Sequence, residues 1–169
     1  VGAYAIIGPD VKIGNRTILE PNTVVERWTN IGEDCHVHYG AIIGNASQDK
    51  KDQGERSFVE IGDRNVFREF VTINRATGKD NKTIIGNDNL FLTHVHIGHN
   101  CILGDRIIIS NSAAIAGHVE IADEAVIGGL VGVTQFCKIG RLAMIGGYSK
   151  LSQDVPPFLL VEGNPGVVR

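Results

Sequence analysis

The 169-residue sequence is short of several residue types on which other protein classes depend. It has 1 Met, 1 Trp and 5 Pro, and only 9 Leu against 38 Ile and Val. Helical domains favour Leu, Ala, Met and Glu, so this balance argues against a helical protein and in favour of strands. The few prolines exclude a collagen repeat, although 21 residues are glycine. No apolar run approaches the roughly 18 residues of a membrane span, so no membrane insertion is expected.

Charge of either sign is also limited. Charged residues make up 21% of the chain and the formal net charge is −3. These values do not fit a disordered tail and provide no general footprint for nucleic acid, so no nucleic-acid partner is expected. Three cysteines, an odd number with no visible signal peptide, fit a reducing compartment. A cytoplasmic location is therefore expected.

A period of six residues runs through most of the chain. Every sixth position from Val1 is apolar in 23 of 29 cases, and the following position is often glycine. This period fits neither an α-helix nor a plain strand, but it fits a short strand followed by a tight turn. Three such units make a triangular coil of 18 residues, and the coils stack about 4.8 Å apart. Glycine is expected at the corners, where φ is positive or backbones approach closely.

This hexapeptide period resembles that of the hexapeptide-repeat acyltransferase superfamily. The resemblance implies an all-β fold, the left-handed parallel β-helix. The handedness rests on the resemblance, because the general rule for crossovers would predict a right-handed coil. Cys35, Cys101 and Cys137 all occupy the fifth position of a hexad, where Ala, Val and Thr otherwise stand. We therefore expect buried packing residues rather than reactive thiols.

The repeat is interrupted twice by polar segments, near residues 46–58 and 76–82. We assign residues 1–156 to the β-helix with these two loop insertions, and residues 157–169 to a C-terminal extension. Residues 50–82 contain 8 of the 16 Lys and Arg residues but also 6 acidic residues. This segment is either a solvated surface or a binding surface for an acidic, phosphate-bearing partner.

Histidines gather where the repeat is regular. Positions 18 apart fall in one column, so His99 lies one rung from Gly117, and His118 lies in the next column. A neutral imidazole can remove a proton from a hydroxyl nucleophile while a backbone N–H receives the oxyanion, which suits acyl transfer. The alternative without catalytic function is that these histidines form a polar corner of the solenoid or fill an interface. A zinc site formed by His94, His99 and His118 is the chemical alternative, because γ-class carbonic anhydrases are similar β-helices with three histidine ligands.

The breaks and the histidine cluster together resemble one family, the UDP-N-acetylglucosamine 3-O-acyltransferases, which catalyse the first step of lipid A synthesis. Its most specific features here are the Gln-Asp loop, the Arg-Glu-x-Val-Thr-Ile segment and the Ala-Gly-His corner. This set argues against the carbonic anhydrase alternative. The segments that carry the resemblance are 43–51, 59–65, 68–75, 96–101, 116–119, 135–137 and 153–157.

The resemblance implies transfer of a (3R)-3-hydroxyacyl chain from acyl carrier protein to the 3-hydroxyl of UDP-N-acetylglucosamine. His99 would be the general base, Gly117 the oxyanion donor and Asn100 the neighbour of the base. No metal or cofactor is expected, because the acyl chain arrives on the phosphopantetheine of acyl carrier protein. Three sites are expected between the subunits of a homotrimer, with Gly147 setting acyl length. The substrate-binding residues would be Gln48, Asp49, Lys51, His96, His118, Gln135 and Gly147.

Three departures from the family pattern stand out. Asn100 replaces the usual Asp and adds no negative charge beside the imidazolium, and Thr134 stands where a histidine is frequent. The family's C-terminal helical domain does not follow, and Val1 already lies inside the repeat, so we expect a piece of a longer enzyme. A non-catalytic trimeric scaffold is the alternative to an enzyme.

Overall fold

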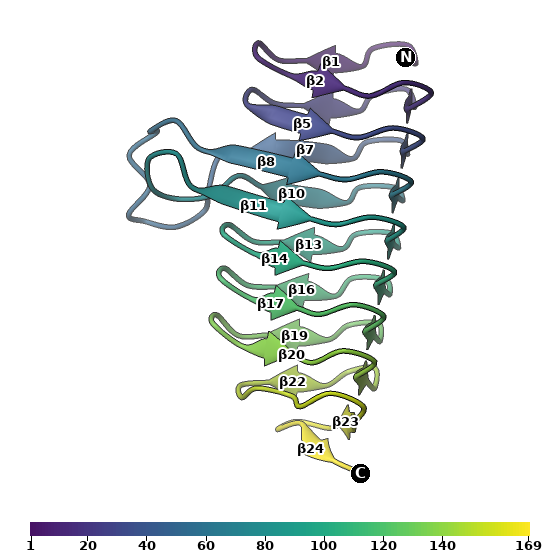
Figure 1. The fold of residues 1–169 in the computed structure, drawn as a ribbon, viewed down its shortest axis with the longest axis vertical. Helices are drawn as coiled ribbons and strands as arrows, with labels where there is room; N and C mark the ends of the chain where they lie inside the picture. Colours follow the sequence, from purple (N-terminus) through teal and green to yellow (C-terminus); the bar gives the residue numbers. More distant parts are fainter.

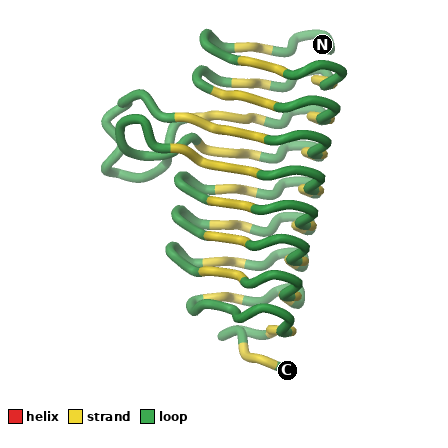
Figure 2. The backbone as a smooth tube through the Cα atoms, in the orientation of Figure 1, coloured by secondary structure: helices red, strands yellow, loops and turns green.

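The computed structural model describes residues 1–169 as a stack of triangular coils with no helix (Figures 1 and 2). Short strands, mostly of two residues, alternate with turns, as the six-residue period predicts. The strands form three sheets, one along each side of the triangle. The all-β solenoid expected from the sequence is confirmed. No segment of the structure could cross a bilayer as a helix.

The three sheets contain every strand of the chain, and all pairs are parallel except β23 with β24. Sheet A consists of β1 (Ile6–Ile7), β4 (Val24–Val25), β7 (Ile42–Asn45), β10 (Thr72–Asn74), β13 (His96–Ile97), β16 (Ala114–Ile115), β19 (Gly132–Val133) and β22 (Lys150–Leu151). Sheet B consists of β2 (Lys12–Ile13), β5 (Thr29–Ile31), β8 (Phe58–Ile61), β11 (Lys82–Ile85), β14 (Ile102–Leu103), β17 (Glu120–Ile121) and β20 (Lys138–Ile139). Sheet C consists of β3 (Ile18–Leu19), β6 (His36–Val37), β9 (Val66–Phe67), β12 (Leu90–Phe91), β15 (Ile108–Ile109), β18 (Val126–Ile127), β21 (Met144–Ile145), β23 (Leu160–Glu162) and β24 (Val167–Val168).

The interior of the stack is one apolar cluster of 35 buried residues. Within it the rings of Phe67 and Phe91 stack with their centroids 5.1 Å apart. Cys35, Cys101 and Cys137 are buried and free, as expected. Burial raises the pKa of the Cys101 thiol to about 12 and also raises the pKa of Cys35, so both thiols are protonated at neutral pH.

The two loops are inserted in whole multiples of the repeat. Ile43 pairs with Ile73, 30 positions further on, and Ile73 pairs with Ile97 after 24 positions, whereas a regular coil takes 18. The insertions therefore add 12 and 6 residues, and the interior phase is kept. The first loop (residues 46–57) and the second loop (residues 75–81) leave the same edge of the stack, between sheets A and B (Figure 1).

Coil geometry continues past residue 156, where the six-residue period places its end. β23 pairs in parallel with β21, and Val161 is buried opposite Ile145. Val161 follows Ile145 by 16 positions instead of 18, so the phase slips by two residues and Pro157 is no longer an interior position. Coil pairing thus extends to about Glu162, beyond the end that the period indicates, because a shortened turn interrupts the period.

The left-handed backbone conformation recurs at the corners of the coils, but the residue that adopts it is rarely glycine. Positive φ values near 60° belong mostly to other residue types, such as Asn22, Asn100 and His118. The repeat glycines lie two positions earlier and serve close approach instead. A Cβ on Gly98, for example, would lie 2.8 Å from the backbone nitrogen of Gly117. The expectation of either positive φ or close approach is therefore met mainly through close approach, with Gly44 (φ +84°) as a repeat glycine of positive φ.

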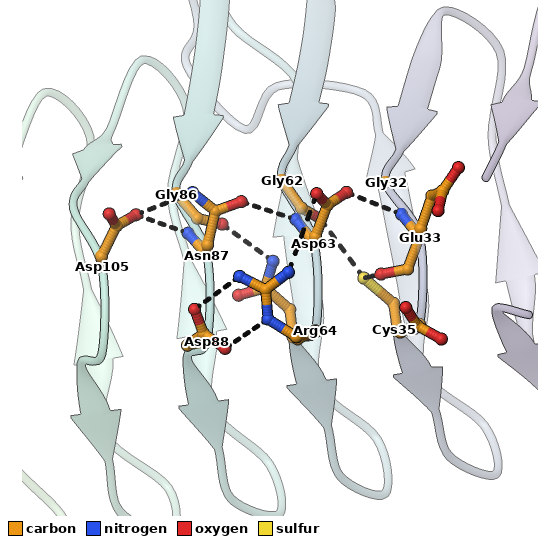
Figure 3. A network of polar contacts seen from close by, with 12 residues as sticks. Gly32, Glu33, Cys35, Gly62, Asp63, Arg64, Gly86, Asn87, Asp88 and Asp105 are labelled. Atoms are coloured by element: carbon orange, nitrogen blue, oxygen red, sulfur yellow. Dashed lines mark hydrogen bonds and ion pairs between the residues drawn. The ribbon is translucent and has the colours of Figure 1, made fainter. Parts of the chain in front are cut away.

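A ladder of side chains satisfies the backbone N–H groups at the corner between sheets B and C (Figure 3). The Oδ1 atom of Asp63 accepts from the N–H of Glu33, that of Asn87 from Asp63, and that of Asp105 from Asn87, at 2.6–2.8 Å. These N–H groups occupy the third position of their hexads. The coil therefore leaves that N–H without a backbone partner, and the sequence supplies one from the next rung.

Candidate functional site

A groove of about 580 Å³ runs along the outer face of sheet A, beside its edge with sheet B. Its floor is hollow because the outward positions of β16 and β19 are small, Ala114 and Gly132. His96 and Lys150 stand in the same column, on either side of this hollow. The groove is lined by Gln48, Asp49, Asn74, His96, Gly98, His99, Ala114, Ile115, Ala116, Gly117, Gly132, Val133, Thr134, Gln135 and Lys150.

His99 follows β13 and is only 4% exposed, at the wall of the groove. Its Nδ1 atom lies 2.9 Å from Oδ1 of Asn100. The backbone N–H of Thr77 donates to the same Oδ1 (2.8 Å), and Nδ2 of Asn100 donates to the carbonyl of Thr77 (3.2 Å). A backbone N–H can only donate and a carbonyl can only accept, so these contacts fix the orientation of the amide. Nδ1 of His99 therefore carries the proton, and Nε2 keeps a free lone pair.

Gly117 lies against the imidazole of His99. A Cβ at Gly117 would overlap the imidazole, with Nε2 as its nearest atom, so only glycine leaves room for this ring. The Gly117 N–H donates to no group of the protein, whereas the corresponding N–H groups in Figure 3 are all capped by side chains. A free N–H thus lies on the groove beside a free imidazole nitrogen, as the column spacing predicts.

Two further histidines, His96 and His118, lie near His99. The ring of His118 meets the ring of His99 edge-on, with centroids 5.1 Å apart, and stacks on Phe136 at 4.8 Å. Nδ1 of His96 lies 2.8 Å from the hydroxyl of Thr72. Burial lowers the pKa of both His96 and His118, and the nearby His99 lowers them further. Both imidazoles are therefore neutral at pH 7.

The first loop brings Gln48 and Asp49 to the groove. Oδ2 of Asp49 lies 4.0 Å from Nε2 of His99. The Asp49 carboxylate is held in turn, because the backbone N–H of Lys51 donates to its Oδ1 atom (3.0 Å). The side chain of Lys51 itself is exposed and does not line the groove.

The remaining predicted residues divide between this groove and another corner. Gln135 lines the groove, and so does Thr134, whose hydroxyl donates to the carbonyl of Leu151 (2.9 Å). Gly147 instead follows β21 in sheet C, close to Gly129, and does not line the groove of its own chain. The site residues named from sequence thus line one groove except for Gly147, the Lys51 side chain and His118, which contacts His99 and Phe136 behind the groove wall.

Sequence reasoning missed several residues of the site. Lys150 and Gly132 stand 54 and 36 positions after His96, so the 18-residue column could have found both. Asn74 and Thr77 carry no such signal, because they belong to the irregular segment where the second loop leaves the coil. Only the folded loop shows that Thr77 contacts Asn100.

The zinc alternative does not fit the geometry. His94 stacks on Phe70 (centroids 5.1 Å apart) at the corner between sheets C and A, away from His99 and His118. No group of three or more His, Cys, Asp or Glu side chains is arranged to hold a metal ion. The three imidazoles named for that alternative therefore do not converge.

Half of the basic side chains in residues 50–82 are paired with carboxylates. These four of the eight are Arg56, Arg64, Arg68 and Lys82. Lys50, Lys51 and Lys79 are in no ion pair and lie on the two loops. Whether this segment receives a phosphate-bearing partner stays a prediction, and its positive charge is confined to the loops.

Known proteins resemble this chain over nearly its whole length. The acyl-[acyl-carrier-protein]–UDP-N-acetylglucosamine O-acyltransferase of Gloeothece citriformis is 53% identical over 146 residues, which cover 86% of this chain and 53% of that protein. The counterpart from Herminiimonas arsenicoxydans is 49% identical over 168 residues, 99% of this chain and 64% of that protein. No family model matches. The chain spans about half to two thirds of the length of these curated relatives.

Solved structures agree with the fold. The UDP-N-acetylglucosamine acyltransferase of Campylobacter jejuni superposes with a TM-score of 0.83 at 36% identity, covering 98% of this chain and 72% of that one. LpxA from Acinetobacter baumannii gives a TM-score of 0.97 at 41% identity, covering 99% and 66%. These neighbours are left-handed β-helices, so the handedness expected from the resemblance is confirmed.

Proposed function

Since the chain belongs to the UDP-N-acetylglucosamine O-acyltransferase family, we propose that its groove transfers a (3R)-3-hydroxyacyl chain from acyl carrier protein to the 3-hydroxyl of UDP-N-acetylglucosamine. This is the first step of lipid A biosynthesis. One observation carries the proposal. The unprotonated Nε2 of His99 and the unpartnered N–H of Gly117 lie side by side on one groove, which is the pair of groups that acyl transfer to a hydroxyl needs.

The chemistry follows from these two groups. Nε2 of His99 removes the proton of the sugar hydroxyl as its oxygen attacks the thioester carbonyl. The negative charge that develops on the carbonyl oxygen is stabilised by the N–H of Gly117. When the tetrahedral intermediate collapses, the C–S bond breaks and the leaving thiolate takes the proton from the imidazolium. Asn100 holds the Nδ1 proton throughout, so the ring keeps one orientation.

The other groove residues are assigned to substrate binding. Gln48, Asp49 and Lys51 come from the first loop and would hold the sugar nucleotide. Asp49 lies 4.0 Å from Nε2 of His99 and does not donate to it, which leaves Nε2 free for the acceptor hydroxyl. His96 and His118, neutral because burial lowers the pKa of each, can donate or accept hydrogen bonds without competing as cations. Gln135 completes the polar side of the groove.

The donor would lie along the hollow floor. Ala114 and Gly132 leave an apolar channel beside the base, and Lys150 stands at its far end. The acyl group arrives on the phosphopantetheine of acyl carrier protein, so the polypeptide itself would need no cofactor. Gly147 would set acyl length by facing the groove of a neighbouring copy, and glycine there favours a longer chain.

A homotrimer is supported by the outer face of sheet C. Seven of the eight outward positions on its parallel strands are apolar, and the eighth is His36. An apolar stripe along a whole side of the stack is typical of an association surface. A cytoplasmic location agrees with these partners. The seven residues are Ile18, Val66, Leu90, Ile108, Val126, Met144 and Leu160.

The test is acyl transfer by the purified chain, with two histidine variants. His99→Ala should lower kcat by roughly 10²–10⁴-fold, the usual contribution of a general base. It should still bind UDP-N-acetylglucosamine in isothermal titration. His94→Ala is the matched control, since His94 stacks on Phe70 away from the groove, and its activity should equal that of the unaltered chain. Transfer that survives His99→Ala, or no transfer by the unaltered chain, contradicts the proposal.

A further inference from the structure

The second loop holds the residue that orients the base, and this is the feature from which a further role follows. Asn100 makes three hydrogen bonds besides the one to His99. Two go to the main chain of Thr77, and in the third its own backbone N–H donates to the hydroxyl of Thr83 (2.9 Å). Thr77 lies in the second loop, and Thr83 lies in β11 directly after it. Every group that holds Asn100 in place thus comes from one short segment.

The contact with Thr83 replaces a regular hydrogen bond of the coil. In uninterrupted coils the residue at this corner position donates its N–H to a backbone carbonyl of the preceding coil. His118 donates in this way to His99, and Phe136 to Gly117. At Asn100 the preceding coil is opened by the second loop, and the N–H donates to Oγ1 of Thr83 instead. The side chain of Thr83 is completely buried, so it is a fixed partner.

We propose that residues 77–83 act as a brace that positions Asn100 and thereby keeps the proton of His99 on Nδ1. The inference rests on the proposed function of the same groove and adds positioning residues to it. If the Asn100 amide turned over, its NH₂ group would face Nδ1, which would then have to accept. The proton would move to Nε2, and the imidazole could no longer remove a proton from a hydroxyl at that atom.

The brace also joins the base to the first loop. The hydroxyl of Thr77 lies 2.6 Å from that of Ser47, next to Gln48 and Asp49. The two loops contact each other again where Gly78 N–H donates to Glu55 (2.9 Å). They project together from one edge of the stack (Figure 1). The loop that would hold the acceptor and the segment that orients the base are therefore one hydrogen-bonded unit.

The brace is tested by the ring ¹⁵N chemical shifts of His99, which report directly which nitrogen carries the proton. The His99 signals are assigned by their loss in His99→Gln. In the unaltered chain near pH 8 we expect one tautomer with the proton on Nδ1. Thr83→Val removes the hydroxyl at nearly constant volume, and the two shifts should converge as tautomers mix. Thr83→Ser restores the hydroxyl and should restore the single tautomer.

Kinetics provide a second readout. Thr83→Val should lower kcat by about tenfold, part of the contribution of a general base, with KM changed less than twofold. Thr77→Val keeps the main-chain contacts to Asn100 and breaks only the link to Ser47. It should therefore leave the tautomer unchanged and raise KM for the sugar nucleotide. Thr23→Val is the matched control, because Thr23 is equally buried and its hydroxyl donates to Glu20 far from the groove.

A purely structural role for Thr83 would lower the melting temperature and leave the tautomer alone, and that result overturns the proposal. If Thr83→Val does not fold, Thr77→Pro removes the N–H that donates to Asn100 at a half-buried loop position, and the same mixing of tautomers is expected. The NMR result does not depend on turnover. A chain with the Nδ1 tautomer held by Thr83 but without transfer contradicts the proposed function and leaves the brace standing.

Discussion

Nδ1 of His99 donates to Oδ1 of Asn100 over 2.9 Å, and the acceptor in this pair is an amide without formal charge. An imidazolium formed in the proposed acyl transfer would thus meet an amide dipole at Nδ1, while the carboxylate of Asp49 lies 4.0 Å away on the Nε2 side. Nδ2 of Asn100, for its part, donates to the carbonyl of Thr77. An aspartate could not make that bond, so the asparagine fits its surroundings on both sides.

Asn100→Asp should therefore shift the pH dependence of activity and lower the stability of the fold. The carboxylate favours the protonated imidazole, so the acid limb of the kcat/KM profile should move to higher pH. The new oxygen would face the carbonyl of Thr77 without a hydrogen bond, so the melting temperature should fall. Both are measured on one preparation, by a pH–rate profile and by calorimetry. An unmoved acid limb would show that the charge does not reach the base.

Gly117→Ala should displace the base without straining the backbone. The new Cβ overlaps the imidazole of His99, whereas Gly117 is not among the residues with positive φ. We expect kcat to fall by at least roughly 10²-fold, since both the base and the oxyanion donor move. Gly129→Ala is the control at the same hexad position of sheet C, where the Cβ meets only the carbonyl oxygen of Asn111 at 3.3 Å. Equal losses in the two variants would contradict this account.

Gly132→Val should close the floor of the groove. A Cβ at Gly132 has no atom within 4 Å, so the side chain enters the hollow rather than the core. The melting temperature should stay within a few degrees, and KM for the acyl donor should rise by about tenfold or more. Binding of UDP-N-acetylglucosamine, followed by titration, should change little. A variant that keeps its KM for the donor would move the acyl chain away from this channel.

Stability should fall as the pH is lowered from about 6.5, before the carboxylates titrate. Burial lowers the pKa of His38, His96 and His118, so just below the ordinary histidine value of about 6.5 the unfolded chain binds more protons than the folded one. This loss is complete once the pH is below the lowered values. Asp34 and Asp88, whose pKa values are lowered by hydrogen bonds from arginine, lose their contribution only in a more acidic window. Melting temperatures between pH 7.5 and 5 check this, and His118→Gln should flatten the slope.

Buried amides should matter more to the fold than exposed ion pairs. Asn89 donates to the carbonyl of Gly104 and accepts from the N–H of Ile107 (3.0 and 2.7 Å), and it is 1% exposed. Asn89→Ala should cost about 2–3 kcal/mol, because it leaves two buried backbone groups without partners. Arg64→Ala removes an exposed pair with Asp88 (Figure 3) and should cost less than about 1 kcal/mol. Chemical denaturation of the two variants compares them, and the reverse order would contradict the argument.

The coil could be predicted from the sequence because every interior position requires an aliphatic side chain. Aliphatic residues at every sixth position share one core only when three short strands form each coil. The column that joins His99 to Gly117 follows from the same spacing. The details that escaped prediction depend on irregular segments. The two-residue slip before Val161 breaks the period, and the contact of Thr77 with Asn100 needs the folded loop. Left-handed φ at residues such as His118 is imposed by the corner and not by residue type.

The insertions of 12 and 6 residues carry a consequence for how this molecule can change. Both lengths are whole multiples of the repeat, so the interior position recurs in the same phase after each loop, and Ile73 and Ile97 stay buried. Residues that project from the stack take no part in its pairing, so a loop at this edge can change in length or sequence while the coils on either side keep their register. The loop residues that line the groove could thus change independently of His99, whose position is set by the regular coil.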